Sequence, residues 1–456
     1  MFDEILEKFA EKSPVTVMVQ GLLERLLDAK KLDEWFESIR ERQYTKTILF
    51  SSIVAVMIEV VCRVRSSVLL AFINSNIETS KVAFYGKLQG LEANTSRELV
   101  RYIAQESEKL IEELNGKNPE VLPGYRTKYV DGNCIEASDH RLKVLRGTSS
   151  GALPGKSLVV FEAELGIVTD VIPCEDGHAQ ERSLLSDILD TVEKNDLWVA
   201  DRNFCVVEFL SRIASSDGFF NIREHKNIPW EPLLNMKFVG ETETGKVYEQ
   251  QVNLSVANKI SKNNNNLKIR RIMVKLNKPT RNGESEIALL TNLPFKDADA
   301  LKVAEIYRLR WTIEIAFQKL EKHLNSEINT LAYPKAALFG FCMALVAFNI
   351  YAVVMAALRT ARPDKDINEE ISEYYIAQEI SSTYNGMLIA VPEQQWNIFK
   401  QASTEEMAAL LLELALQIDL LKFKKHKRRT KKISPKKTKY HGKPHVSTAR
   451  LIAGNA

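Results

Sequence analysis

Three polar residues have the spacing of one helix face and could therefore act together. Tyr307, Arg310 and Glu314 lie three and four positions apart in the run Ile306–Asn325, which contains no helix-breaking residue. At about 100° per residue they fall beside an apolar face that would pack on a core. That apolar face comprises Ile306, Leu309, Ile313, Ala316, Phe317 and Leu320. We predict one continuous helix with a phenol, a cation and a carboxylate along a buried edge; a surface helix with spaced charges is the simpler alternative.

Two aspartates upstream each end a predicted strand. Asp131 follows the β-prone run Arg126–Val130, and Asp201 follows Leu197–Ala200. Because α/β sheets place chemistry at the carboxyl ends of their strands, both side chains can point into one cleft. Taken alone, either aspartate could cap a following turn instead. Together with the helix, the two aspartates predict a site of three carboxylates, Asp131, Asp201 and Glu314.

The chemical type of this set indicates the cation that it would hold. Three carboxylates without a His or Cys set suit hard cations that prefer oxygen ligands, so we expect Mg²⁺ or Mn²⁺ rather than zinc. Two such ions about 4 Å apart can activate the attacking oxygen and neutralise the leaving oxygen of a phosphodiester. We assign Asp131 to both ions and Asp201 and Glu314 to one ion each. Arg310 and Tyr307 would hold phosphate oxygens.

The order of the predicted elements indicates the fold that holds these residues. After a boundary at Pro119–Gly124, periodicity and turn residues predict three strands, a helix, a strand, a helix and a strand. Their ranges are Thr127–Ile135, Ser157–Glu164, Ile167–Pro173, His178–Lys194, Leu197–Asp201, Val206–Ala214 and Gly218–Ile222. This is the order of the ribonuclease-H-like α/β fold. In that fold the acidic residues occupy the places of Asp131, Asp201 and Glu314.

The remaining segments predict further domains around this core. Short β-prone runs between turn-rich patches predict a small β domain inserted before the helix of Glu314, and a capping box at Ser403 and Glu406 opens a late helix. The predicted divisions are a helical domain at 1–118, the catalytic core at 119–224 and 287–360, the β insertion at 225–286, a helical C-terminal region at 361–421 and a basic tail at 422–456.

These motifs resemble a known family. Tyr307, Arg310 and Glu314, with Val-Asp131-Gly and Ala-Asp201-Arg-Asn-Phe, resemble the DDE transposases of bacterial insertion sequences, specifically the insertion sequence 4 family. The family signature continues with a Lys separated from the Glu by six residues. Glu321 stands there in this chain, and Lys322 is the candidate for the basic role.

The resemblance implies a cut-and-paste transposase. Water would nick the element end, the freed 3′-hydroxyl would form a hairpin on the opposite strand, water would reopen it, and the hydroxyl would join target DNA. The partners would be double-stranded DNA, as terminal inverted repeats and target, and a second copy of the chain in a synaptic complex. Residues 1–118 would recognise the terminal repeats. The alternatives are a nuclease of the same fold, a decayed transposase that only binds DNA, and a DNA-binding regulator that acts through its basic tail.

Several basic and aromatic residues are candidates for DNA contact. The loop after the first Asp contains Lys143, Arg146 and Lys156, and is either a phosphate-contacting loop or an ordinary solvated one. By resemblance, Arg223 accompanies the second Asp. The family's base-stacking Trp aligns near Ile287 in this chain, so Trp230 or Tyr248 is left to take that role.

The charge of the chain is unevenly distributed. The formal net charge of the whole chain is +3. The segment after Asp419 has thirteen Lys and Arg and no acidic residue, so the first 419 residues have a net charge of −10. A tail of this kind predicts a polyanionic partner, although a solvated tail without a partner has the same composition.

Cysteine usage and hydropathy predict the compartment. Five cysteines without close pairs or zinc-like spacing predict buried free thiols in a reducing cytoplasm, and the N-terminus lacks a secretory signal. The uncharged run Ala336–Leu358 could span a bilayer, but its alanines and Asn349 favour a buried helix. We therefore expect a cytoplasmic protein without a membrane partner, and the family resemblance implies a bacterial, nucleoid-associated one.

Overall fold

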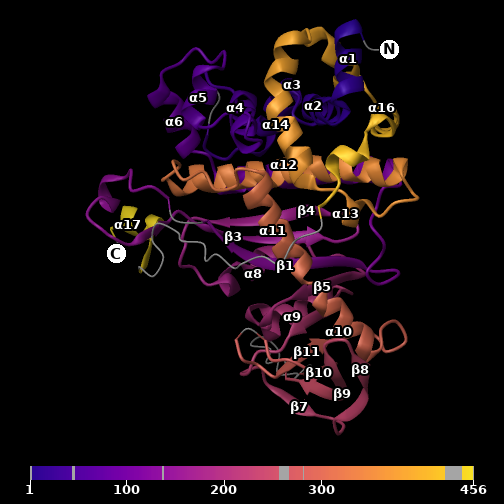
Figure 1. The fold of residues 1–456 in the computed structure, drawn as a ribbon. Helices are drawn as coiled ribbons and strands as arrows, with labels where there is room; N and C mark the ends of the chain where they lie inside the picture. Colours follow the sequence, from indigo (N-terminus) through magenta and orange to yellow (C-terminus); the bar gives the residue numbers. More distant parts are fainter. Residues whose placement is uncertain are drawn as a thin grey trace.

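The fold is a large sheet covered by helices (Figure 1). It was obtained as a computed structural model, which describes residues 3–43, 47–135, 138–255, 266–280, 282–426 and 444–454. One long helix, α12, lies between the sheet and a group of helices from both ends of the chain (Figure 1). The chain thus has a mixed α/β architecture, as expected.

The first part of the chain is helical, as predicted. Its helices are α1 Glu4–Lys12, α2 Pro14–Leu26, α3 Ala29–Ile39, α4 Phe50–Val61, α5 Val68–Ile73, α6 Lys81–Gln89 and α7 Ala93–Glu113. Asp3, Asp28, Ser67 and Ser80 accept backbone N–H bonds at the starts of α1, α3, α5 and α6, which satisfies donors that a helix start leaves unpaired. The apolar faces of α4 and α7 pack against α12.

The sheet is built around β1. The strands of its first half are β1 Arg126–Cys134, β3 Lys156–Glu162, β4 Ile167–Cys174, β5 Asp196–Ala200 and β6 Phe219–Arg223. Their order is β4-β3-β1-β5-β6, with β5 and β6 parallel to β1, and β3 and β4 in an antiparallel meander from it. Helix α9, Val207–Ser215, connects β5 to β6.

The connection from β4 to β5 differs from the prediction. In place of one helix over 178–194, a 3₁₀ turn η2 at Glu181–Leu184 leads into a short helix α8 at Leu185–Leu189. The chain leaves the helix before Thr191 and Val192, whose β-branched side chains disfavour helix.

The predicted β insertion extends the same sheet. Its strands are β7 Trp230–Pro232, β8 Lys237–Thr242, β9 Gly245–Leu254 and β10 Leu267–Leu276, followed by the returning strand β11 Glu286–Thr291. Strand β11 pairs antiparallel with β6 and with β10, so ten strands of the described chain form one sheet. The insertion therefore has the predicted strands and shares its backbone hydrogen bonds with the core.

Helix α12, Pro334–Ala361, confirms the prediction of a buried helix. Within the described residues it is the one helix long and apolar enough to cross a membrane, with a mean hydropathy of 2.3, and 94% of that apolar stretch is buried. The Asn349 side chain accepts from the Val168 N–H and donates to the Val168 carbonyl, both at 2.8 Å. These bonds satisfy a backbone position of β4 inside the core.

Apart from the last helix, the remaining helices and 3₁₀ turns of the described chain lie between Lys143 and Phe423. They are α10 Ala300–Arg308, α11 Trp311–His323, α13 Ile367–Glu370, α14 Glu373–Ala390, α15 Asn397–Gln401 and α16 Thr404–Gln417, with 3₁₀ turns η1 Lys143–Leu145, η3 Arg202–Phe204, η4 Glu393–Trp396 and η5 Leu420–Phe423. The capping box of Ser403 and Glu406 is present at the start of α16. Cys62, Cys205 and Cys342 are buried as expected, whereas Cys134 on β1 is exposed.

The end of the chain returns to the core. Most of the predicted basic tail, 427–443 with Tyr440 and His441, lies outside the described residues. Beyond it, strand β12, His445–Ser447, pairs parallel with β2, Gly151–Leu153, and leads into α17, Thr448–Ile452. Arg450 forms an ion pair with Asp176 at 2.7 Å.

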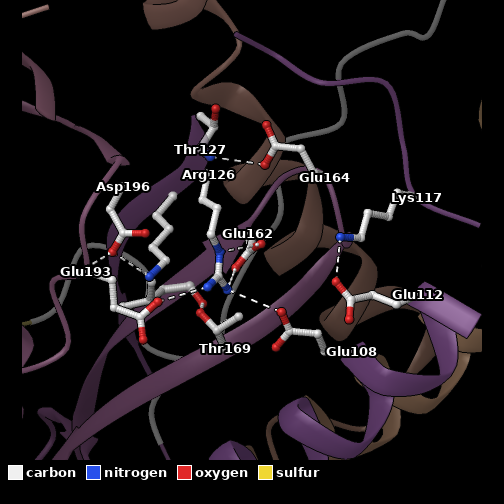
Figure 2. Close-up of polar contacts among 12 residues, drawn as sticks. Glu108, Glu112, Lys117, Arg126, Thr127, Glu162, Glu164, Thr169, Glu193 and Asp196 are labelled. Atoms are coloured by element: carbon white, nitrogen blue, oxygen red, sulfur yellow. Dashed lines mark hydrogen bonds and ion pairs between the residues drawn. The ribbon is translucent and has the colours of Figure 1, made fainter. Parts of the chain in front are cut away.

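A charged network fixes the end of β1 that lies away from Asp131 (Figure 2). Arg126 bonds to Glu162 on β3 at 2.8 and 3.2 Å and also reaches Glu193 at 2.9 Å. Lys128 forms an ion pair with Asp196 on β5 at 2.7 Å, where the side chains are 7% and 0% exposed. The three central strands are thereby held in register by side chains as well as by backbone.

Lys128→Met should destabilise the protein by about 3–5 kcal/mol, because it leaves the Asp196 carboxylate buried without its cation. Burial already raises the pKa of Asp196, so the loss should be smaller at pH 5, where the carboxyl can take up a proton, than at pH 8. Urea unfolding at both pH values measures this. The matched control is Lys109→Met, which removes the exposed pair with Glu106 and should cost at most about 1 kcal/mol. Equal losses in the two variants would contradict the prediction.

Candidate functional site

Asp131 and Asp201 lie on adjacent strands at the same level. In the parallel pair of β1 and β5, Val130 is opposite Ala200, so the next residue of each strand is an aspartate. Neighbouring strands are about 4.8 Å apart, which brings the two carboxylates together. Asp201 directly follows β5, as predicted, whereas β1 continues past Asp131 to Cys134 through its pairing with β3.

Glu314 reaches the aspartates through Arg310. The Arg310 guanidinium donates to Asp131 Oδ2 at 3.1 Å and to Glu314 Oε1 at 2.8 Å. Arg310 is 8% exposed, so both bonds form largely away from water, where charge-assisted hydrogen bonds are strong. One buried cation therefore joins a carboxylate of the sheet to a carboxylate of α11.

A second pair of groups contacts Asp201. The Tyr307 hydroxyl donates to Asp201 Oδ1 at 3.4 Å, and Arg223 Nη1 lies 3.9 Å from the same oxygen. Burial and the charge of Asp201 raise the pKa of Tyr307 to about 12, so the phenol keeps its proton and stays a donor at neutral pH. Asp131, Asp201 and Glu314 are thus gathered around Arg310, Tyr307 and Arg223.

The predicted single helix over Ile306–Asn325 is wrong. Helix α10 ends at Arg308, and α11 begins at Trp311. No residue of this run breaks a helix by its own propensity, so local sequence gives no signal for the interruption. The break coincides with Arg310, whose ion pair to Asp131 is a tertiary contact that local propensity does not encode.

The surroundings of Asp131 make its ionised form less favourable than it is in water. Burial raises the pKa of Asp131 to about 6, the charge of Arg310 opposes this rise, and Glu314 and Glu181 add to it. Glu181 lies directly over Gly132, where a Cβ would meet its carboxylate, so a larger residue after Asp131 would require that side chain to shift. The sequence signal for this close approach is the Asp-Gly pair, and nothing in the local sequence points to Glu181.

The other predicted DNA contacts lie in different surroundings. Lys143 and Arg146 are exposed on and beside η1, and Lys322 is exposed on α11, where it bonds to Gln318. Lys156 instead donates to the Ala179 carbonyl at 2.7 Å and holds that loop in place. Of the five basic candidates, Arg223 is the one that contacts the carboxylates.

The aromatic candidates are engaged in packing. Trp230 donates its indole N–H to Glu224 and stacks under Arg271, whose guanidinium lies 4.8 Å from the ring centroid. The Tyr248 ring packs on Phe238, and Ile287 is half-buried on β11. Trp311, which we did not select from the sequence, is 59% exposed at the start of α11 beside Arg310.

The side chains of the cleft fit a hard divalent cation by type. Carboxylate oxygens are its preferred ligands, and Asp131, Asp201 and Glu314 come from three elements that meet here. Within the described ranges no three His, Cys, Asp or Glu side chains form a preformed metal cluster, because the guanidinium of Arg310 lies between two of the carboxylates. Arg310 supplies the positive charge that the carboxylates require when no other cation is bound.

Comparisons with known proteins match this chain to transposases. A family model described as "Transposase DDE domain" matches residues 124–350. A Synechocystis sp. protein assigned as the transposase for insertion sequence element IS4SA is 24% identical over 192 residues, which are 41% of this chain and 45% of that protein. The Escherichia coli transposase for insertion sequence element IS421 is 35% identical over 80 residues, 17% of this chain and 22% of its own. The matches thus span less than half the length of these relatives.

A structural comparison gives a weak likeness. The chain of a piggyBac transposase synaptic complex with hairpin DNA aligns with 85% of this chain and 84% of its own, with 9% identity and a TM-score of 0.39.

The stability of the metal-free protein should fall as the pH rises from about 4 to about 6. The folded-state pKa of Asp131 is raised to about 6 from an ordinary 3.8, so in this window the folded protein binds more protons than the unfolded chain. The contribution is fully present below about pH 4 and is lost as the pH rises through about 6. Urea unfolding in chelator from pH 4 to 7.5 measures the free energy of unfolding. That free energy should fall less with pH in Asp131→Asn than in the unaltered protein.

Asp190→Asn is the control, because that side chain is 84% exposed and lies away from the cleft. It should keep the pH dependence of the unaltered protein. Identical pH profiles for Asp131→Asn and the unaltered protein would show that the Asp131 carboxyl does not titrate in this range.

Proposed function

We propose that this chain, which belongs to the DDE transposase family through residues 124–350, cuts and joins DNA at the ends of a mobile element. The observation that carries the proposal is the meeting of Asp131, Asp201 and Glu314 around one buried guanidinium. Such a gathering of carboxylates is unfavourable unless cations compensate it, and catalysis of phosphoryl transfer is a reason to retain it.

We propose a ribonuclease-H-like core at 119–224 and 287–360. What supports it is the strand order β4-β3-β1-β5-β6, in which β3 alone runs antiparallel to the other four strands. Around it, residues 1–118 would bind the terminal inverted repeats. Residues 225–286 would form an insertion with its own DNA contacts, 361–421 a helical support and 422–456 a basic tail.

Asp131, Asp201 and Glu314 would hold two Mg²⁺ or Mn²⁺ ions. Bound there, the ions supply Lewis-acid activation of the attacking oxygen and stabilise charge on the leaving oxygen. Arg310 is placed to hold an oxygen of the phosphate that is cut, and Tyr307 to orient Asp201 through its hydroxyl. The exposed ring of Trp311 beside them is placed to contact a base.

The reaction would proceed by hydrolysis and transesterification. Water attacks the phosphorus at the element end, and the 3′-oxygen leaves as a hydroxyl. That hydroxyl then attacks the opposite strand to give a hairpin, which water reopens before the 3′-end is joined to target DNA. Two copies of the chain would hold two ends in one complex, and the protein would act in the bacterial nucleoid.

One observation favours a second candidate, a DNA-binding protein derived from a transposase. Arg310 already neutralises Asp131 and Glu314, and Glu321 stands where the family has a Lys. A chain that had lost catalysis could keep its DNA contacts. Strand-transfer products from a plasmid that carries the element ends separate the two functions.

Asp131→Ala should lower Mg²⁺-dependent nicking of element-end DNA by at least about 10³-fold, because it removes the carboxylate shared by both ions. The affinity for the same DNA should change little, since Asp131 does not contact DNA directly in this proposal. Nicking on a labelled duplex and fluorescence anisotropy measure the two properties. The control Glu208→Ala removes an exposed carboxylate on α9 and should leave both unchanged. Nicking that persists in Asp131→Ala would mean that another acid holds the metal.

Replacing Lys427, Arg428, Arg429, Lys431 and Lys432 with Gln should weaken DNA binding and its salt dependence while sparing sequence preference. Each lost phosphate contact reduces the slope of log K against log salt by about 0.9. The pairing of β12 with β2 involves none of the replaced residues, so this variant keeps it. A transposase should still prefer element ends over unrelated DNA, whereas a regulator that binds through its tail should lose nearly all affinity.

A further inference from the structure

A carboxylate of the β insertion reaches into the neighbourhood of Asp201. Glu284 lies in the turn between β10 and β11, and its two oxygens accept bonds from two different arginines. Arg202 Nη1 donates to Oε1 at 2.9 Å, and Arg223 Nη2 donates to Oε2 at 2.6 Å. The two guanidinium groups therefore converge on one anion.

The two arginines flank Asp201. Arg202 directly follows it at the start of η3, and Arg223 at the end of β6 places its other nitrogen 3.9 Å from Asp201 Oδ1. The guanidinium fork matches the oxygens of a phosphate as well as those of a carboxylate. An anion bound between these arginines would thus lie directly beside a carboxylate of the proposed catalytic site.

Glu284 is more exposed than other acidic partners of arginine in the neighbouring strands, although the Thr280 hydroxyl also donates to it at 3.4 Å. It is 28% exposed and directly follows Gly283, whose φ is +80°, where glycine is favoured. The pairs Arg270–Glu249 and Arg271–Glu224 join strand residues whose acidic side chains are 18% and 12% exposed. A carboxylate on a turn can move away from its arginines without breaking the sheet.

The charges explain why an anion must fill this position. Without Glu284, the two guanidinium groups would lose the carboxylate that both of them bind, and like charges repel. Arg223 and Arg202 hold the pKa of Glu284 below its usual range, so the carboxylate is ionised at neutral pH. A phosphodiester supplies the same charge and the same acceptor geometry.

We propose that Arg202 and Arg223 form a phosphodiester-binding site beside Asp201, and that Glu284 occupies this site as an internal substitute for the phosphate until DNA displaces it. The proposal rests on the proposed function, since it names where a backbone phosphate of the bound strand would lie. It makes Glu284 a residue that lowers affinity for DNA and keeps the two arginines arranged before DNA binds.

Glu284→Gln keeps the shape of the side chain and removes its charge. We expect it to tighten binding of inorganic pyrophosphate and of an element-end duplex by about 5–10-fold, because the neutral amide competes less well for the arginines. Calorimetry in chelator measures pyrophosphate, and anisotropy in Ca²⁺ measures the duplex. Glu286→Gln is the matched control, since that exposed carboxylate lies two residues away and pairs with Lys275. It should leave both affinities unchanged.

The arginines provide the second half of the test. Arg202→Gln should weaken pyrophosphate binding, and in the double variant with Glu284→Gln the gain should be lost. Glu284→Gln could instead weaken pyrophosphate binding, or change it no more than Glu286→Gln does. In either case Glu284 only stabilises the positions of the arginines, and the proposal is overturned. A tighter pyrophosphate site in a protein that never cuts DNA would support this site while refuting the proposed catalytic function.

Discussion

Carboxylates gathered in one cleft repel each other, and the guanidinium of Arg310 compensates that repulsion in this protein. It bonds to Asp131 on β1 and to Glu314 on α11 while remaining 8% exposed. Removing such a cation would leave two carboxylates close together in surroundings poor in water, which is costly. The position of α11 against the sheet and the break before it follow from this pair of contacts, and the charge of Arg310 also opposes the rise that burial causes in the pKa of Asp131.

The remainder of the core holds the strands so that these contacts can form. At the far end of β1, the buried pair Lys128–Asp196 fixes its register with β5. On the other side, Arg97 from α7 binds Asp170 on β4 through two bonds at 2.7 and 2.9 Å, and Asn349 of α12 bonds to β4 as well. Buried polar groups that pair with one another favour one arrangement of helices against strands.

The protein described without DNA keeps much of its positive charge near the site in internal ion pairs. Arg310 pairs with the two carboxylates, and Arg202 and Arg223 pair with Glu284 from the insertion. This makes the insertion part of the site in two ways, through strand β11 beside β6 and through the side chain of Glu284. A polyanion that binds here must exchange partners with groups that are already paired, so specificity and affinity depend on the same contacts.

The sequence by itself determined the order of strands along the first half of the core, the helical first part, the buried α12 and the choice of Asp131, Asp201 and Glu314 as candidate site residues. These follow from local periodicity, from turn residues and from carboxylates that end apolar strands, as at Asp201. Only the tertiary structure decided the break between α10 and α11, the joining of the insertion to the core sheet, and the contacts of Glu181 and Glu284. Each of these depends on contacts between residues far apart in the chain, such as Glu284 and Arg202. Contacts of this kind produce no periodic pattern in the sequence, so local sequence does not predict them.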